Sequence, residues 1–240
     1  MDSFKTEEEM RGVEMGENPL IRLVDVSKVY HLESGDFTAL NHVSLDIMEN
    51  EFVAIMGPSG SGKSTMLNQL GILDVPTTGE LHIDGKNVAQ MTPLERTHMR
   101  RDTIGYVFQK FYLIPLLSAY ENVEYPLILR YKHRDTTGKA AAVLKSVGFD
   151  EEMSSHRPNQ LSGGQQQRVA IARALVNEPK IILCDEPTGN LDRKTGLQIM
   201  ELLVDLHQKG KTVILVTHDP KIAEYAHRTI LLDDGKVVAS

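Results

Sequence analysis

The stretch FVAIMGPSGSGKS, residues 52–64, decides the fold of this 240-residue chain. Its first five residues form a continuous apolar run, as expected for a β-strand that is covered on both faces. Residues 57–64 then match the phosphate-binding pattern G-x-x-x-x-G-K-[ST] at every fixed position, and residues 65–70 can continue as a helix. Strand, glycine-rich loop and helix in this order favour a nucleotide site over a chance Gly-Ser loop with an incidental lysine.

The residue types of this loop predict how it holds phosphate. Glycines permit positive φ and a close approach of the backbone, so consecutive N–H groups can surround a β-phosphate at the positive end of a helix. Lys63 is expected to reach the β- and γ-phosphates, and the Ser64 hydroxyl to bind Mg²⁺. The predicted nucleotide-binding residues of this segment are Gly57, Pro58, Ser59, Gly60, Ser61, Gly62, Lys63, Ser64 and Thr65.

A second apolar strand, residues 181–184, ends in two carboxylates, Asp185 and Glu186. Ligands gather at the carboxyl ends of the strands in a parallel sheet, so Asp185 is expected near the Mg²⁺. Glu186 then lies where a base could take the proton of an attacking water. Adjacent carboxylates repel unless a cation is present. Two exposed loop acids are the alternative. Cys184 is predicted to be a buried structural thiol rather than a reactive one.

The rest of the chain alternates between sheet and helix. Strands are predicted at 21–26, 40–47, 81–85, 104–108 and 212–217, and a hairpin at 229–238. An amphipathic helix at 197–206 lies between two strands, which indicates a βαβ unit and a parallel sheet. Residues 110–160 have helical spacing, and we expect Pro115, Pro126 and Pro158 to interrupt them.

Composition excludes several classes of protein. The 26 Lys and Arg residues against 33 Asp and Glu give a net charge of −7, so no broad nucleic-acid surface is expected. No apolar run is long enough to span a bilayer, and the N-terminus lacks the apolar segment of a signal peptide. Residues 1–18 are acidic and are predicted to form a flexible tail before a single domain at 19–240. A single cysteine favours a cytoplasmic protein.

The sequence LSGGQ at 161–165 decides the class. Ser162 suits the N-cap of the helix that follows. Capping does not explain the two glycines, which remove side chains from a helix N-terminus and so create a second phosphate-binding surface.

The chain resembles the ATP-binding subunits of ABC transporters over residues 20–240. The resemblance is carried by MGPSGSGKSTMLN at 56–68, NQLSGGQQQRVAIARALVN at 159–177 and DEPTGNLD at 185–192, which are most similar to the branch of lipoprotein-release and macrolide-efflux ATPases. It implies an α/β fold: a P-loop NTPase (RecA-like) core with a mostly parallel sheet, an N-terminal antiparallel β subdomain, and a helical subdomain inserted at about 110–170.

The resemblance also implies roles for individual residues. Gln109 matches the residue that touches Mg²⁺ and senses the membrane partner, and Tyr30 the aromatic that stacks on adenine. Asp192 matches the D-loop, and His218 the switch histidine. The signature residues Leu161, Ser162, Gly163, Gly164 and Gln165 are then expected to act across a dimer.

The implied mechanism is ATP hydrolysis at a head-to-tail homodimer interface that forms with ATP. ATP and Mg²⁺ are the implied ligands. Ser64, Gln109 and Asp185 are expected to bind the metal, and Glu186 and His218 to act in catalysis. A transmembrane permease subunit is the implied partner, which places the chain at the cytoplasmic face of the membrane. Residues 110–117 are apolar enough to form either core or a groove for that partner.

Two other classes remain as alternatives. A soluble ABC ATPase acting on ribosomes or DNA usually has two cassettes or a long coiled-coil insert, and the chain has one cassette and no such insert. A phosphate-loop kinase or GTPase is disfavoured by LSGGQ and by the lack of an N-K-x-D motif. The cargo and the direction of transport do not follow from these residues.

Overall fold

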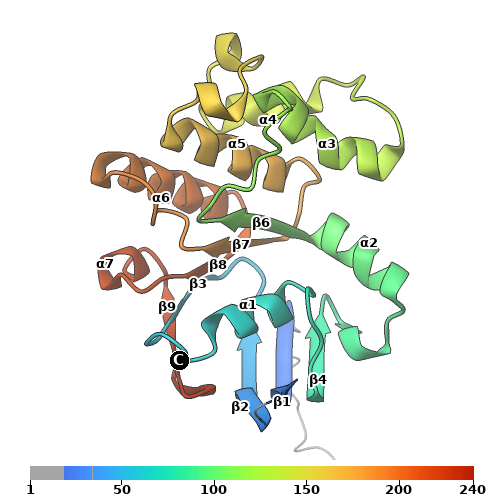
Figure 1. Cartoon of the computed structure of the whole chain (residues 1–240), viewed down its shortest axis with the longest axis vertical. Helices are drawn as coiled ribbons and strands as arrows, with labels where there is room; N and C mark the ends of the chain where they lie inside the picture. The colour runs from blue at the N-terminus through green and yellow to red at the C-terminus, as the bar shows by residue number, and fades with distance from the viewer. Residues whose placement is uncertain (1–18, 34) are drawn as a thin grey trace, which may run out of the picture.

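The computed structural model describes residues 19–33 and 35–240, so the predicted acidic tail lies outside the described residues. Two β-sheets flank helix α1, and further helices cover the far side of the larger sheet (Figure 1). Within the described ranges, no helix combines the length and apolar character needed to cross a bilayer.

The larger sheet has six strands in the order β10-β9-β3-β8-β7-β6. β3, β6, β7, β8 and β9 run parallel to their neighbours, and β10 pairs antiparallel with β9. The βαβ unit and the C-terminal hairpin are therefore confirmed. The strands are β3 (Phe52–Met56), β6 (Ile104–Phe108), β7 (Ile181–Asp185), β8 (Thr212–Val216), β9 (Arg228–Asp233) and β10 (Lys236–Ala239).

Alternate residues of these strands enter two separate cores, because successive side chains of a strand point to opposite faces. Ile181 and Leu183 pack with α1 and the smaller sheet. Ile182 and Cys184 pack with the helices of the opposite face. This is why strands such as 52–56 are apolar throughout. Cys184 is fully buried, and burial raises the pKa of its thiol, as expected for a structural residue.

The smaller sheet is antiparallel and has the order β2-β1-β4-β5. Its strands are β1 (Ile21–Leu32), β2 (Gly35–Ile47), β4 (Thr78–Ile83) and β5 (Lys86–Asn87). Helix α1 (Lys63–Leu70) inserts Met66, Leu67 and Leu70 into the core between the two sheets. α2 (Pro93–Thr103) begins at a capping box formed by Thr92 and Glu95, and it leads directly into β6.

Helices cover the other face of the six-stranded sheet (Figure 1). They are α3 (Ala119–Tyr131), α4 (Lys139–Ser146), α5 (Gly163–Leu175) and α6 (Arg193–Gln208), and the short α7 (Pro220–Ala223) follows β8. The range predicted as a helical insert, 110–170, contains α3, α4 and the first half of α5. The boundary of that subdomain stays a prediction.

Pro126 does not interrupt the chain as predicted, because it lies inside α3. A proline in a helix removes one backbone hydrogen bond and normally costs about 3 kcal/mol. The first turn of α3 is held independently by the buried side chain of Asn122, whose amide bonds to the backbone of Ile114, Leu117 and Ser118. Val123 and Leu127 are buried on both sides of the proline, so packing outweighs the local preference.

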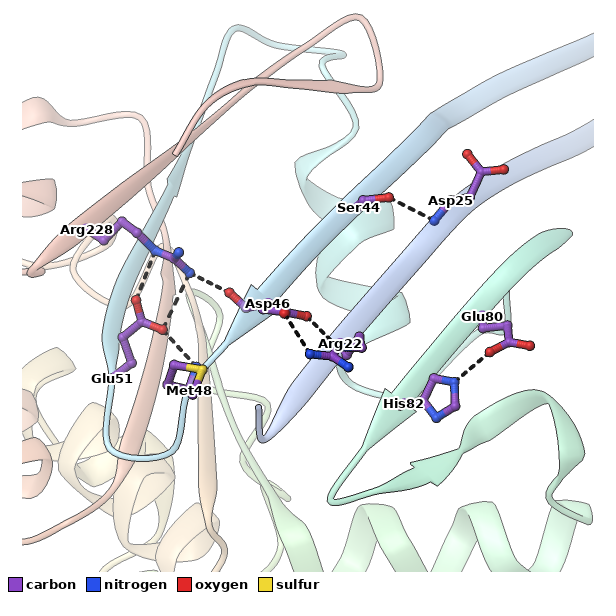
Figure 2. Close-up of polar contacts among 9 residues, drawn as sticks. All are labelled: Arg22, Asp25, Ser44, Asp46, Met48, Glu51, Glu80, His82 and Arg228. Carbon is purple, nitrogen blue, oxygen red and sulfur yellow. Dashed lines mark hydrogen bonds and ion pairs between the residues drawn. The ribbon is translucent and has the colours of Figure 1, made fainter. Parts of the chain in front are cut away.

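The two sheets are also tied by a polar cluster at the amino end of β3 (Figure 2). The guanidinium of Arg228, the first residue of β9, lies 2.9 Å from the Glu51 carboxylate and donates to the backbone oxygen of Asp46 at 2.7 Å. The Asp46 carboxylate in turn accepts from Arg22 at 3.0 Å. These contacts join β9 to β2 and β1 at the end of the sheet opposite to the phosphate loop.

Candidate functional site

The phosphate loop connects β3 to α1 and depends on two glycines. Gly57 and Gly62 have φ values of 153° and 100°. A Cβ at Gly57 would overlap the backbone oxygen of Leu232, and one at Gly62 would lie 2.5 Å from the oxygen of Ala39. The chain passes between the two sheets at these two points, and only glycine fits there. The C-terminal hairpin supports the loop, since the Gly235 N–H donates to the Ser61 carbonyl at 3.1 Å.

The donors of this loop fit a phosphate group. The first N–H groups of α1 have no intrahelical acceptor, as at the start of any helix, and no side chain among the described residues caps them. Within residues 19–33 and 35–240, the Lys63 ammonium bonds only to the carbonyl oxygens of Gly57 and Pro58, each at 2.7 Å. The hydroxyl of Ser61 is buried without a partner among the described residues. A polyanion would satisfy this set of donors.

Three charged groups meet at the ends of β7 and β8. The Glu186 carboxylate accepts from the backbone N–H of His218 at 3.1 Å and lies 2.7 Å from Nδ1 of its ring. The hydrogen bond and the charge of Glu186 raise the pKa of His218 above its ordinary value. Burial and Glu186 raise the pKa of Asp185, whereas the charge of Lys63 opposes that rise. The structure thus brings Glu186, Asp185 and His218 together, close enough to Lys63 for its charge to act on them.

The geometry of Glu186 is set by its backbone. Its φ is 47°, a left-handed conformation that non-glycine residues seldom adopt. Its N–H donates to the Val216 carbonyl at 3.0 Å, which continues the pairing of β7 with β8 beyond the strand. The turn directs the carboxylate to His218, and only 19% of the Glu186 side chain is exposed.

Oxygen donors for Mg²⁺ are present near this site. Ser64 lies in the first turn of α1, and Asp185 ends β7. Among residues 19–33 and 35–240, no group of three His, Cys, Asp or Glu side chains could hold a metal by itself. A magnesium site here would therefore share its ligands with nucleotide phosphates, as Mg²⁺ commonly does.

Gln109 follows β6, which is the neighbour of β7. Its side-chain amide lies 3.4 Å from Oδ1 of Asn190, and Nδ2 of Asn190 donates to its backbone oxygen at 2.9 Å. The structure therefore places Gln109 beside the 189–192 segment, and no hydrogen bond in the described part of the chain joins it to Asp185 or Ser64.

The signature residues form the start of α5. Ser162 and Gln165 make the predicted cap reciprocally, with Ser162 Oγ accepting from the Gln165 N–H and Gln165 Oε1 accepting from the Ser162 N–H. The N–H groups of Gly163 and Gly164 are left without an intrahelical acceptor. The glycines also have a packing reason, because a Cβ at Gly164 would overlap Cγ2 of Thr195. Leu161 is buried.

Two other predicted residues have contacts that sequence reasoning missed. Asp192 is the N-cap of α6, and hydrogen bonds from Thr195 lower the pKa of its carboxyl. The hydroxyl of Tyr30 bonds to Asp74 at 3.1 Å, beyond the C-terminal turn of α1, so the tyrosine lies at the far end of that helix from Lys63. Its stacking on adenine stays a prediction.

An apolar groove lies beside the segment that leaves Gln109. It has a volume of about 740 Å³ and is lined by exposed Leu73, Leu94, Tyr112 and Leu129 together with Arg100 and Lys132. Arg173 of α5 holds the segment by donating to the carbonyls of Phe111 and Tyr112. Leu116 of the same segment is 78% exposed. Of residues 110–117, Tyr112 lines this groove, whereas Leu113 packs against the core beneath the helices. The role of the segment as a contact for a membrane partner stays a prediction.

Asn190 and Arg173 were not identified from the sequence as parts of this arrangement. Both lie within the quoted motif segments, but their contacts depend on which strands are neighbours in the sheet. Only the register of β6 against β7, which aligns Phe108 with Asp185, brings Gln109 to Asn190.

Comparisons with known proteins agree with this geometry. Residues 40–189 match the model of the family described as ABC transporter. The chain is 54% identical over 223 residues, 91% of its length, to an uncharacterized ABC transporter ATP-binding protein of Methanocaldococcus jannaschii, MJ0796, and covers 95% of it. It is 49% identical over 92% of its length to the macrolide export ATP-binding/permease protein MacB of Escherichia coli, but spans only 34% of that protein.

Solved structures give the same result. A dimeric structure of the MJ0796 ATP-binding cassette, in a post-hydrolysis state bound to ADP and Pi, matches with a TM-score of 0.83 and 52% identity, over 91% of this chain and 96% of that one. The phosphate-loop fold expected from the sequence is thereby confirmed. The chain belongs to the family of ABC transporter ATP-binding proteins, whose members bind ATP with Mg²⁺ and hydrolyse it.

Proposed function

We propose that two copies of this chain bind two ATP molecules between them and that their hydrolysis drives a membrane permease. The observation that carries the proposal is the Glu186–His218 pair beside Lys63, at the open start of α1. Each copy supplies one such start and one signature. A head-to-tail dimer would place Lys63 of one copy opposite Ser162, Gly163 and Gly164 of the other. The dimeric cassette structures support this arrangement.

In this proposal some of the site residues bind the nucleotide and others take part in its hydrolysis. Lys63 and the N–H groups of residues 57–65 hold the phosphates, and Tyr30 stacks on the base. Glu186 takes the proton of the attacking water, and His218 orients Glu186 and contacts the γ-phosphate. Ser64, Asp185 and Gln109 hold Mg²⁺, which neutralises charge on the phosphate oxygens. Asp192 and the signature residues, from Leu161 to Gln165, act across the dimer.

The apolar groove is the proposed contact with the permease. Contiguous exposed apolar surface on a soluble domain commonly marks a protein interface. The relatives named MacB contain ATP-binding and permease parts in one protein, and this chain spans about a third of them. We therefore place the chain at the cytoplasmic face of a membrane, next to a transmembrane subunit, with no direct nucleic-acid contact.

The first experiment tests the site residues with Glu186→Gln. We expect the variant to bind ATP and to elute as a dimer with ATP in size-exclusion light scattering, because its binding groups are intact. Its turnover should fall by at least about 100-fold, as expected for loss of a catalytic base. Lys63→Ala in the same background should remain monomeric. Turnover of Glu186→Gln at the wild-type rate would show that Glu186 is not the base.

The second experiment tests the partner. Tagged protein is purified in mild detergent from its native membranes, and co-purifying proteins are identified by mass spectrometry. A stoichiometric protein with several membrane spans is expected, and it should be lost when Leu94 and Leu129 are both changed to serine. Recovery of ribosomal proteins or DNA factors alone would favour the soluble alternative, for which the relatives give no support.

A further inference from the structure

Two segments leave neighbouring strands at the site and lead to different surfaces. Phe108 pairs with Asp185 in the sheet, so Gln109 and Glu186 are the first residues after β6 and β7. The segment after Gln109, residues 110–117, leads to the apolar groove. The segment after Glu186 leads to the start of α6 at Asp192.

Asn190 joins these segments through both polar atoms of its amide. Nδ2 donates to the backbone oxygen of Gln109 at 2.9 Å, and Oδ1 faces the Gln109 side-chain Nε2 at 3.4 Å. The Gln109 amide also lies directly over Gly189, where a Cβ would be only 2.5 Å from Nε2. The first bond fixes the backbone of Gln109, and the second fixes its side chain.

Further hydrogen bonds extend the Asn190–Gln109 contact on each side. The Gly189 N–H donates to the Glu186 carbonyl at 3.0 Å, which connects Asn190 to the turn that directs the Glu186 carboxylate. On the groove side, Arg173 holds the carbonyl of Phe111 at 2.7 Å, and it also binds that of Tyr112. Phe111 and Tyr112 have φ values of 59° and 46°, so Arg173 holds a strained turn that begins two residues after Gln109.

The start of α5, which carries the signature residues, also lies close to these two segments. A Cβ at Gly163 would lie 3.3 Å from Cδ2 of Leu191 and 4.0 Å from Cζ of Phe111. Leu191, which follows Asn190, and Phe111, two residues after Gln109, therefore both lie close to the start of α5. A displacement of the groove segment has a continuous path of contacts to Glu186 and to the signature of the same copy.

We propose that Asn190 is a positioning residue that couples the groove segment, residues 110–117, to the strand end that carries Glu186. The inference rests on the proposed function, which assigns Glu186 and the groove their roles. Asn190 does not act on ATP. It keeps Gln109 and the groove segment in one arrangement relative to Glu186. A structural change in the groove segment therefore alters the position of Glu186, and a change at Glu186 alters the groove segment. Coupling of this kind typically corresponds to 0.5–2 kcal/mol, or about 2- to 30-fold in a rate.

The direct test is hydrogen exchange on the wild type and on Asn190→Ala, each with and without ADP and Mg²⁺. In the nucleotide-free variant, amides of residues 109–113 should exchange at least about 3-fold faster, because one anchor of the segment is lost. Nucleotide should alter exchange at 110–117 in the wild type but not in the variant, while the affinity for ADP stays within about 2-fold. Asn87→Ala, which removes a comparable turn-capping amide on the smaller sheet, is the matched control.

The functional test is a double-mutant cycle with Gln109→Ala. Asn190→Ala alone should lower kcat by about 3- to 10-fold with KM for ATP unchanged. Its effect should be smaller when Gln109 is already alanine, because only the bond to the backbone oxygen of residue 109 is then left to lose. Gly189→Ala leaves Asn190 in place but pushes the Gln109 amide away, and it should lower kcat in the same way. Gly189 has no positive φ, so its backbone accepts alanine.

The outcomes separate this inference from the proposed function. Unchanged exchange at 109–113, or additive effects of the two substitutions on kcat, would overturn the role of Asn190 and leave the ATPase proposal intact. If the wild type itself hydrolyses no ATP, the proposed function fails, and the nucleotide-free exchange data still decide whether Asn190 holds Gln109.

Discussion

Two helices of the chain, α1 and α5, begin at glycine-rich segments. The start of α1 offers most of a phosphate-binding surface within one chain, whereas the start of α5 offers only part of one. In the described part of the chain, the start of α1 has no side-chain cap, and the side-chain donors of Lys63 and Ser61 are satisfied by loop carbonyls or not at all. The start of α5 is capped by Ser162 and Gln165, which leaves only the N–H groups of Gly163 and Gly164 for a ligand. The first start is built to bind phosphate within one chain. The second has its own structural support and adds contacts only when a partner copy presents a nucleotide.

Removal of the positive charge at the open start should have the largest effect. Lys63→Ala is expected to lower turnover by at least about 100-fold, since a charge that stabilises developing negative charge is lost. Its unfolding free energy should change by less than about 1 kcal/mol, because the Lys63 side chain donates to two carbonyls of its own loop and to no other group in the described part of the chain. Steady-state ATPase assays and urea unfolding measure the two quantities. A stability loss that accounts for the lost activity would contradict this reading.

The second prediction concerns packing at the capped start. Gly164→Ala forces a methyl group into Cγ2 of Thr195 and should cost about 1–3 kcal/mol of unfolding free energy. Adding Thr195→Ser removes that methyl and keeps the hydroxyl that bonds to Asp192, so the double variant should recover most of the loss. If the double variant is as unstable as the single one, the glycine is not required by this contact.

A smaller effect is expected for the cap itself. Ser162→Ala removes the acceptor for the Gln165 N–H and should lower the unfolding free energy by about 1 kcal/mol. Ser162→Asp retains an N-cap acceptor and should keep most of that stability, yet its charge should weaken the ATP-dependent dimer of Glu186→Gln. Equal dimer formation by both variants would argue against a nucleotide contact at this start.

The smallest effect is a titration. His218 should titrate above the ordinary histidine value in an NMR pH series, and Glu186→Gln should return its pKa towards that value. Because the folded pKa is raised, the stabilisation from this pair is fully present below the unfolded pKa of about 6.5 and is lost as pH rises through the folded value. An identical His218 titration in both proteins would show that the contact does not persist in solution.

Much of the fold follows from local patterns. The strands at 52–56 and 104–108 have the predicted limits because each is apolar, short and followed by a distinct turn. The residues of the phosphate loop and of the capped start of α5 could be identified because the whole motif is contiguous in sequence. A function whose residues all lie in one continuous segment can therefore be predicted from the sequence.

Features that depend on neighbours in space were missed. Pro126 was expected to interrupt the helical spacing of residues 110–160, but the polar anchors of Asn122 and the burial of Leu127 keep α3 intact. The tie between Gln109 and Asn190 joins residues that are 81 positions apart. Tyr30 was predicted at the base of the nucleotide, and its bond to Asp74 depends on how the smaller sheet lies against the end of α1.

The order of strands in the larger sheet has a consequence for synthesis. β3 is followed by the phosphate loop, and among the described strands it pairs with β8 and β9 alone. The loop itself is supported by Gly235. During synthesis on the ribosome, β3 therefore has no neighbouring strand to pair with until residues 212–231 have been translated. The phosphate loop is among the first parts of the chain to be translated and among the last to be assembled. A truncated chain that ends before residue 212 therefore carries the entire loop but lacks the strands and the Gly235 contact that support it.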